Sequence, residues 1–233
     1  LRTFVYPVCA FIVLLLLWQV CVMLSTSEIA FPTPVAVFKE FFYILTHKVG
    51  NYYTVVGHVL WSLSRVLVGF SIAAVLGIIL GLTMGWFDYV RAVMMPIFNL
   101  LRPIAPLAWI PLAILWFGIG FQSKAFLVFL FSVFTILYNT VTGAKECKKE
   151  YLKVARVFRA NRFQTVFLVI IPAALPSIFN GLKLAAATAL TGVLFSEMQS
   201  ARAGLGYLLT ESQNLLNTPR MFFLIILITL LSV

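Results

Sequence analysis

The sequence KECKKEYLKVARVFRANRFQTVFLVIIP, residues 145–172, decides the fold of this chain. It holds 7 of the 17 Lys and Arg residues and lies between two long uncharged runs. Its first apolar residues recur at i, i+3, i+4 and i+7, the spacing of one helix face, and the cations lie opposite them. These apolar residues are Tyr151, Val154, Ala155 and Phe158. A polar break at 159–162 follows, and Pro172 and Pro176 are expected to interrupt the second apolar run. The segment therefore predicts a helix, a turn and a helix.

The composition of the whole chain indicates a membrane protein. Hydrophobic residues make up 62% of the sequence, charged residues 10%, and the mean hydropathy is +1.05. A soluble chain of 233 residues needs more polar surface than this, so the lipid bilayer is expected to be its solvent. The net charge is +10, and the positive residues are concentrated in one segment between spans. The positive-inside rule explains that pattern and places the segment in the cytoplasm, so we expect no nucleic acid partner.

Runs without charge, each roughly 20 residues long, predict the spanning helices. The expected spans are Thr3–Leu24, Val66–Phe87, Pro103–Ser123, Ala125–Ala144, Pro176–Ser196 and the start of a sixth at Met221–Val233. Alternation places the short Asp88–Arg91 turn inside and the loop Glu197–Arg220 outside. The fold class expected is therefore an all-α membrane protein with about six spans, the last truncated, in a single domain over residues 1–233.

Small residues recur every fourth position along the second span. They are Gly69, Ala73, Gly77, Gly81 and Gly85. Such a strip allows another helix to approach closely, so van der Waals contact can hold the pair in lipid. We expect a packing groove within one chain, and a dimer contact is the alternative.

Four prolines lie within 16 residues in and just before the third span, so this stretch cannot be one straight helix. They are Pro96, Pro103, Pro106 and Pro111. Irregular backbone at membrane depth is tolerated only where it is buried in protein or lines a wet cavity, so this segment is a candidate transport path. The candidate residues are Arg102, Pro103, Ala105, Ala108 and Trp109, with Glu197 and Met198 at the outer end of the fifth span. Arg102 is equally well explained as a cation that snorkels to the interface, and Glu197 as an ordinary interfacial carboxylate.

The chain also resembles a known family. Lys153-Val154-Ala155, then Arg159, then Val169-Ile170-Ile171-Pro172 have the spacing of the cytoplasmic hallmark of membrane subunits of binding-protein-dependent ATP-binding-cassette (ABC) importers. Runs resembling the nitrate, sulfonate, taurine and bicarbonate branch, which also includes thiamin-precursor importers, extend over nearly the whole chain. These runs are FPTP at 31–34, SLSRVLVGF at 62–70, PLAILWFG at 111–118, PAALP at 172–176 and GLGY at 204–207.

The resemblance implies a type I importer permease of the bacterial inner membrane, working as a homodimer. It implies two kinds of partner: ATPase subunits, which carry ATP and Mg²⁺, and a periplasmic or lipid-anchored substrate-binding protein. No cofactor is expected on this chain. The residues implied to couple to the ATPase are Tyr151, Lys153, Val154, Ala155, Phe158, Arg159 and Pro172.

Two positions depart from the hallmark. The family's Glu is Lys153 here, which predicts an acidic or open polar surface opposite it on the ATPase. Its Gly is Arg159, and because glycine tolerates positive φ best, Asn161 is expected to adopt that conformation instead. The plainer alternative for the whole basic segment is a solvated loop that obeys the positive-inside rule.

Catalytic chemistry finds no support in the sequence. It contains no Gly-x-x-x-x-Gly-Lys-Ser/Thr loop, and its two histidines lack neighbouring ligands for a metal site. A self-contained secondary transporter or channel remains an alternative, although neither an inverted repeat nor paired ionisable residues are evident in the spans. An intramembrane enzyme is a third. Gly204-Leu205-Gly206 predicts a turn, and residues 207–216 predict a short helix over the pathway mouth or a lid that caps the span ends.

Overall fold

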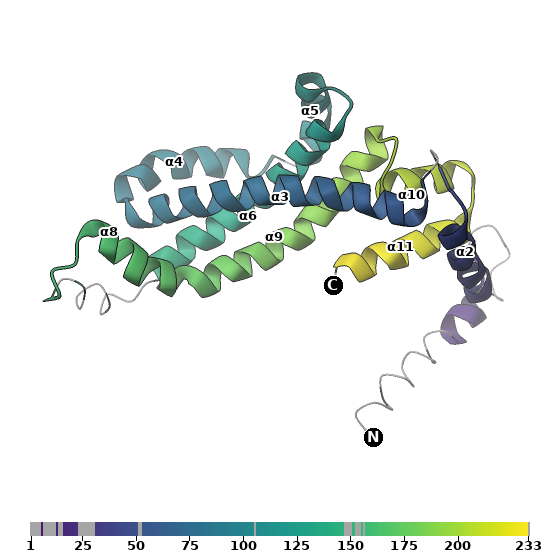
Figure 1. Cartoon of the computed structure of the whole chain (residues 1–233), viewed down its shortest axis with the longest axis horizontal. Helices are drawn as coiled ribbons and strands as arrows, with labels where there is room; N and C mark the ends of the chain where they lie inside the picture. Colours follow the sequence, from purple (N-terminus) through teal and green to yellow (C-terminus); the bar gives the residue numbers. More distant parts are fainter. Residues whose placement is uncertain are drawn as a thin grey trace. The chain divides into compact units, whose positions relative to one another are not determined.

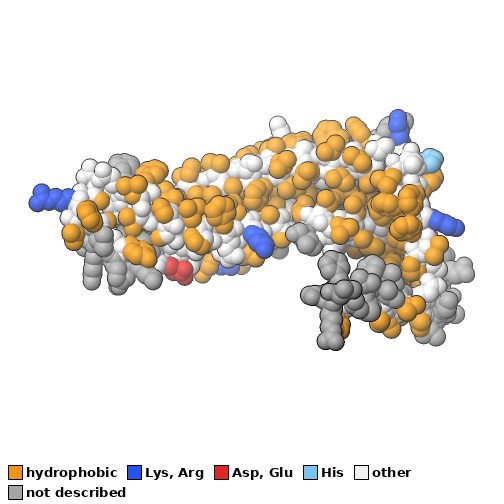
Figure 2. All heavy atoms as spheres, turned by 60° about the horizontal axis from the view of Figure 1, so that its bottom comes forward, with side chains coloured by type: hydrophobic (Ala, Val, Ile, Leu, Met, Phe, Trp, Pro, Cys, Tyr) orange, Lys and Arg blue, Asp and Glu red, His pale blue; other side chains and the backbone are white. Residues whose placement is uncertain are grey.

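The computed structural model describes residues 6, 13, 16–22, 31–50, 53–104, 106–146, 151, 155 and 157–232 (Figure 1). Within these ranges there is no β-strand, and the only pairing of that kind is an isolated antiparallel bridge between Val49 and Tyr53. The all-α expectation is therefore confirmed. On the face drawn in Figure 2, hydrophobic side chains predominate and Lys and Arg side chains are few, as a lipid-solvated surface requires.

Helices account for nearly all of the described chain. In order they are α2 Pro34–Thr46, α3 Val55–Trp86, α4 Asp88–Leu101, the 3₁₀ helix η1 Pro106–Trp109, α5 Ile110–Phe117 and α6 Phe121–Lys145. There follow α8 Arg162–Thr165, the π-helix η2 Val166–Ile170, α9 Ile171–Ser200, α10 Leu205–Asn214 and α11 Thr218–Ser232. Among the described residues, three helices are long and apolar enough to cross a bilayer: Val55–Trp86, Phe121–Lys145 and Val166–Ser200. Most of the predicted first span, Thr3–Leu24, lies outside the described residues.

The predicted third span, Pro103–Ser123, is not a spanning helix. It consists of η1 and the eight-residue α5, which ends at Gly118 with φ 72°. Eight residues rise only about 12 Å, less than half of the hydrocarbon thickness. The prolines break the backbone as expected, so the irregularity was predicted correctly and the span was not.

Helix α4 replaces the predicted Asp88–Arg91 turn. The chain reverses at Phe87, and Asp88 already belongs to the first turn of α4, where it forms an ion pair with Arg91 at 2.7 Å. Met94 and Phe98 of α4 pack against a buried cluster that contains Met84 of α3. The charges that suggested a loop thus belong to the exposed start of a packed helix.

A single helix continues from Val166 to Ser200, although Pro172 and Pro176 were expected to interrupt it. The π-helical turn η2 immediately precedes Pro172, and the N–H of Ile171 reaches back five residues to the carbonyl of Val166. Such a wider turn accommodates a missing proline N–H without ending the helix. The fifth span is therefore longer than the predicted Pro176–Ser196.

The chain forms two compact units, residues 63–196 and residues 1–62 with 197–233. In the first unit, the small-residue strip of α3 lies against α6. A Cβ added at Gly81 would lie 2.5 Å from Cβ of Thr140, and a Cβ added at Gly77 would lie 3.0 Å from Ile136. Gly69 and Gly85 meet α6 in the same way, and Ala73 is fully buried. The structure thus places the strip at a helix contact within the chain.

In the second unit, α11 contacts both α2 and α10. Phe41 of α2 packs edge-on against Phe223 of α11, with ring centroids 5.5 Å apart. Nε of Arg220 donates to Oε1 of Glu40 at 2.7 Å, and both side chains are largely buried. These contacts fix α2 beside the first turns of α11.

Candidate functional site

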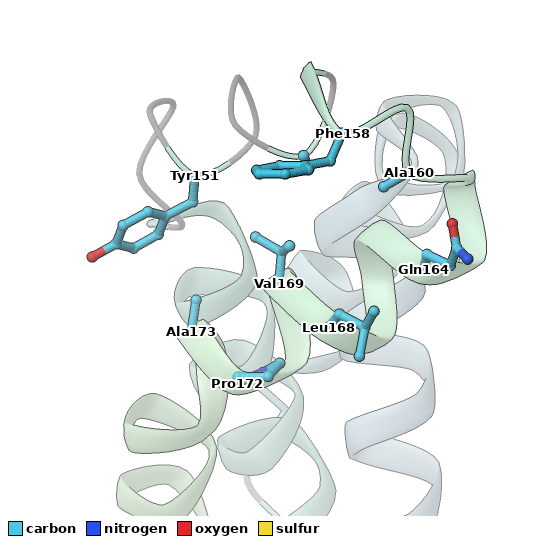
Figure 3. A pocket seen from close by; sticks show the side chains of 9 residues that line it. Tyr151, Phe158, Ala160, Gln164, Leu168, Val169, Pro172 and Ala173 are labelled. Carbon is cyan, nitrogen blue, oxygen red and sulfur yellow. The ribbon is translucent and has the colours of Figure 1, made fainter.

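An apolar groove of about 490 Å³ lies in the unit of residues 63–196, between residues 151–160 on one side and α8, η2 and the start of α9 on the other (Figure 3). The residues that line this apolar groove are Tyr151, Ala155, Phe158, Ala160, Gln164, Leu168, Val169, Pro172 and Ala173. Figure 3 shows Tyr151 and Phe158 on one side of it, with Leu168, Val169, Pro172 and Ala173 on the other. Its lining is therefore almost entirely hydrophobic.

The groove collects most of the residues expected to couple to an ATPase. Tyr151, Phe158 and Pro172 line it, and Ala155 is buried within it. Two large apolar side chains remain open to solvent, since Phe158 is 81% exposed and Leu168 is 72% exposed. Lys153 and Val154 lie outside the described residues.

The residues 158–161, hereafter the arginine turn, border the groove. Arg159 itself adopts positive φ, at 52°, and the N–H of Ala160 donates to the carbonyl of Ala155 at 3.0 Å. A Schellman cap has this bond: the N–H of the residue after the positive-φ residue donates to a carbonyl five residues earlier, in the last turn of the helix. The expectation that Asn161 would take the positive-φ position is wrong, because Arg159 takes it.

Asn161 has a different role, at the start of the next helix. Its N–H donates to Oε1 of Gln164 at 2.8 Å, and its carbonyl accepts from the N–H of Thr165 at 2.9 Å. This is the reciprocal half of a capping box, in which a glutamine at the third helical position binds the N-cap amide. The turn thus ends one helix and starts the next with backbone and short-range bonds alone.

The predicted transport-path residues lie in different environments. Arg102 is the C-cap of α4, is exposed, and places its guanidinium 5.0 Å from the ring centroid of Tyr138. Pro103 and Ala108 are exposed, whereas Trp109 packs beside the buried residues of α5. Ala105 lies outside the described residues, and Met198 is half-buried. Their role in a path stays a prediction.

Glu197 is buried, in the unit of residues 1–62 and 197–233, and it binds the segment 204–206, hereafter the glycine turn. Only Gly204 of the turn predicted there lies outside a helix, because it is the N-cap of α10 and Leu205 and Gly206 are the first helical residues. The carboxylate is 1% exposed and accepts from the hydroxyl of Ser62 at 2.8 Å and from the N–H of Gly206 at 3.0 Å. The hydroxyl of Ser62 also accepts from the N–H of Leu205 at 2.9 Å. Glu197 is therefore a buried acceptor for side-chain and backbone donors rather than an exposed carboxylate.

His58 completes this arrangement. Its Nδ1 accepts from the N–H of Gly204 at 3.0 Å, so its Nε2 carries the proton and donates to the carbonyl of Val49 at 2.9 Å. Three successive backbone amides at the start of α10 are thus paired with three buried side chains. These are groups that a helix start otherwise leaves unsatisfied, and the negative carboxylate also complements the helix dipole.

Only glycine fits at position 204. Its φ is 130°, and a Cβ there would overlap the carboxyl group of Glu197. The helix predicted for residues 207–216 is present as α10. Within it, the phenol of Tyr207 donates to Oε1 of Glu211 at 3.3 Å, and burial together with that carboxylate raises the pKa of Tyr207 above its usual 10.0.

The cluster formed by His58, Ser62 and Glu197 was not predicted, although the sequence contained part of the pattern that indicates it. His58 and Ser62 are spaced i, i+4 and share a face at the start of an apolar helix. Polar groups inside a membrane helix need partners, so this pair indicated a buried contact, but Glu197 is too distant in sequence to be identified as that partner. Among the residues that the structure describes, no group of three or more His, Cys, Asp or Glu side chains is arranged to hold a metal ion.

Comparisons with known proteins agree on one family. Residues 73–233 match the family described as "Binding-protein-dependent transport system inner membrane component". The nitrate import permease protein NrtB of Synechocystis sp. is 34% identical over 89% of this chain and 76% of its own length. The bicarbonate transport system permease protein CmpB of Synechococcus elongatus is 32% identical over 88% and 76%. The taurine transport system permease protein TauC of Escherichia coli is 30% identical over 86% and 73%.

A solved structure supports the fold. A chain of the MetNI methionine ABC transporter, in an inward-facing conformation, matches with a TM-score of 0.63 at 19% identity. The match covers 83% of this chain and 92% of that chain. Together with the long apolar helices, these likenesses show that this multi-pass membrane protein belongs to the family of binding-protein-dependent transport system inner membrane components, the permease subunits of ABC importers.

Proposed function

We propose that this permease works as a homodimer in a bacterial inner membrane and imports a small anion delivered by an external binding protein. Two ATPase subunits on the cytoplasmic side bind ATP and Mg²⁺ and drive the transport. The names of the relatives support this class, because they describe permeases for the anions nitrate and bicarbonate and for taurine, which carries a negatively charged sulfonate group. Exposed Arg102 adds a cation beside the Pro-broken segment, and two copies in a dimer would create a potential that attracts anions. A self-contained secondary transporter has no comparable support.

The observation that carries the ATPase partnership is the apolar groove. The basic segment lies on the cytoplasmic side by the positive-inside rule, so lipid does not cover Phe158 and Leu168 there. Burial of a Phe or Leu side chain stabilises a complex by about 1.5–3 kcal/mol each. A partner that fills the groove therefore removes two exposed side chains from water, and the ATPase subunit is the partner this position implies.

The substitution Phe158→Asp tests this proposal. Because Phe158 is 81% exposed, its replacement should leave the isolated permease folded. We expect affinity for the ATPase to fall about tenfold or more, from the lost burial and the added carboxylate. ATP-driven uptake in proteoliposomes should fall with it. Affinity is measured by titrating the purified ATPase against the reconstituted permease.

The matched control is Val157→Asp, which adds the same charge at a residue that is 80% exposed and lies outside the groove lining. Equal losses in the two variants would assign the effect to charge alone and contradict the groove. Ala155→Asp is a weaker probe, because Ala155 is already buried within this chain, at 7% exposed. A carboxylate there would disturb the packing of the permease itself. An acidic ATPase surface opposite Lys153 remains a further prediction.

A further inference from the structure

Helix α2 has an apolar face that the described protein does not cover. Val35, Phe38, Phe42 and Leu45 recur at i, i+3, i+7 and i+10, and their exposed fractions are 62%, 64%, 55% and 42%. This spacing keeps them on one side of the helix. Large aromatic side chains exposed to this extent are unfavourable in water, so the face has another solvent or partner.

The opposite face of α2 is packed against its own unit. Val37 is 6% exposed and Ile44 is 0% exposed, and Glu40 on this side pairs with Arg220. Arg220 lies in the first turn of α11, immediately before the apolar run that begins at Met221. The ion pair therefore holds α2 at the level where the predicted sixth span enters the bilayer.

The length and the charges of α2 are those of a helix that lies at the surface of the bilayer. A helix of 13 residues is about 20 Å long and too short to span the hydrocarbon. Glu40 is the only acidic residue of α2 and points to Arg220, whereas the cation Lys39 is exposed beside the apolar face. Apolar aromatic residues flanked by lysine are typical of helices that lie in the membrane interface and attract anionic lipid.

We propose that α2 lies in the bilayer interface, with Phe38 and Phe42 inserted toward the acyl chains and Lys39 at anionic lipid headgroups. Through Glu40 and Arg220, the helix then fixes the depth at which α11 begins. This surface is separate from the apolar groove, and its test requires neither the ATPase nor the substrate.

Spin labels on single cysteines test the insertion. The three native cysteines are replaced by serine, and cysteine is placed at Phe38, at Phe42 or, as a control, at Phe41, which packs against Phe223. The permease is reconstituted in vesicles of phosphatidylcholine and phosphatidylglycerol. We expect labels at 38 and 42 to collide frequently with oxygen and rarely with a water-soluble nickel chelate, and the label at 41 to be shielded from both.

Two results overturn the insertion. Frequent collisions with nickel at 38 and 42 would place the face in water, and shielding from both reagents would show that another protein surface, such as a second copy of this chain, covers it.

The headgroup contact is tested by omitting phosphatidylglycerol. We expect the ratio of oxygen to nickel collisions at 42 to fall severalfold on omission, and the variant Lys39→Gln to lose this lipid dependence. The role of Lys39 is contradicted if the ratio of oxygen to nickel collisions does not change with phosphatidylglycerol. It is also contradicted if Lys39→Gln retains the dependence of this ratio on phosphatidylglycerol.

Discussion

The glycine turn and the arginine turn both join two helices through a residue with positive φ, but they are held in opposite ways. At the glycine turn, buried side chains of His58, Ser62 and Glu197 bind three consecutive amides. At the arginine turn, the bonds are local, and Arg159 is exposed to solvent. A turn built on buried side chains depends on distant residues and on glycine, whereas a turn built on its own backbone tolerates another residue type.

The largest effect is expected from Glu197→Leu. This change leaves the hydroxyl of Ser62 and the N–H of Gly206 without their buried acceptor, and each buried group left unsatisfied costs about 1–3 kcal/mol. We expect a lower unfolding temperature of the purified permease and faster amide exchange at residues 204–206. Glu197→Gln should be milder because one carbonyl oxygen remains.

The control for Glu197 is Asp88→Asn. Asp88 is also acidic and paired, but its side chain is 84% exposed. Exposed ion pairs contribute about 0–1 kcal/mol, so this variant should unfold close to the parent temperature. Similar losses in both variants would show that burial does not distinguish Glu197. They would contradict the claim that the glycine turn depends on buried side chains.

An intermediate effect is expected from Gly204→Ala. The methyl group meets the carboxyl of Glu197, and φ of 130° is strained for any side chain, so about 2–3 kcal/mol should be lost. Gly120→Ala is the matched control, because φ there is −162° and no atom lies within 4 Å of the added Cβ. Thermal unfolding of the two variants measures the difference. An unchanged Gly204→Ala protein would mean that the turn rearranges at little cost.

Features with a short sequence period were predicted well, because they follow from helix geometry alone. The strip from Gly69 to Gly85 was identified by its period of four, and the structure places it against Thr140 and other residues of α6. The sequence identified the face but not its partner, since any helix whose side chains fit can pack against a strip of small residues. Charge-free runs likewise predicted α6 nearly to its ends.

Features that depend on tertiary contacts were missed. The π-helical turn before Pro172 keeps a long helix intact where local rules predict a break. Helix α4 contains Pro96 and begins with charged residues, so local rules do not predict it. Its packing against the cluster that contains Met84 is a tertiary contact that the sequence pattern does not reveal. Glu197 joins Ser62 across 135 positions, a distance over which no local pattern operates.

The smallest effect, and the one of opposite sign, is expected from Arg159→Gly. Glycine removes the cost of positive φ, about 1 kcal/mol, while its larger loss of backbone entropy on folding offsets part of that gain. We therefore expect a gain of a few tenths of a kcal/mol, measured as slower exchange of the Ala160 N–H that donates to Ala155. Arg159→Ala removes the guanidinium but retains the strain, so it should give no gain. Equal slowing in the Gly and Ala variants would assign the effect to the lost charge. It would also show that the arginine turn, like the glycine turn, is governed by side chains.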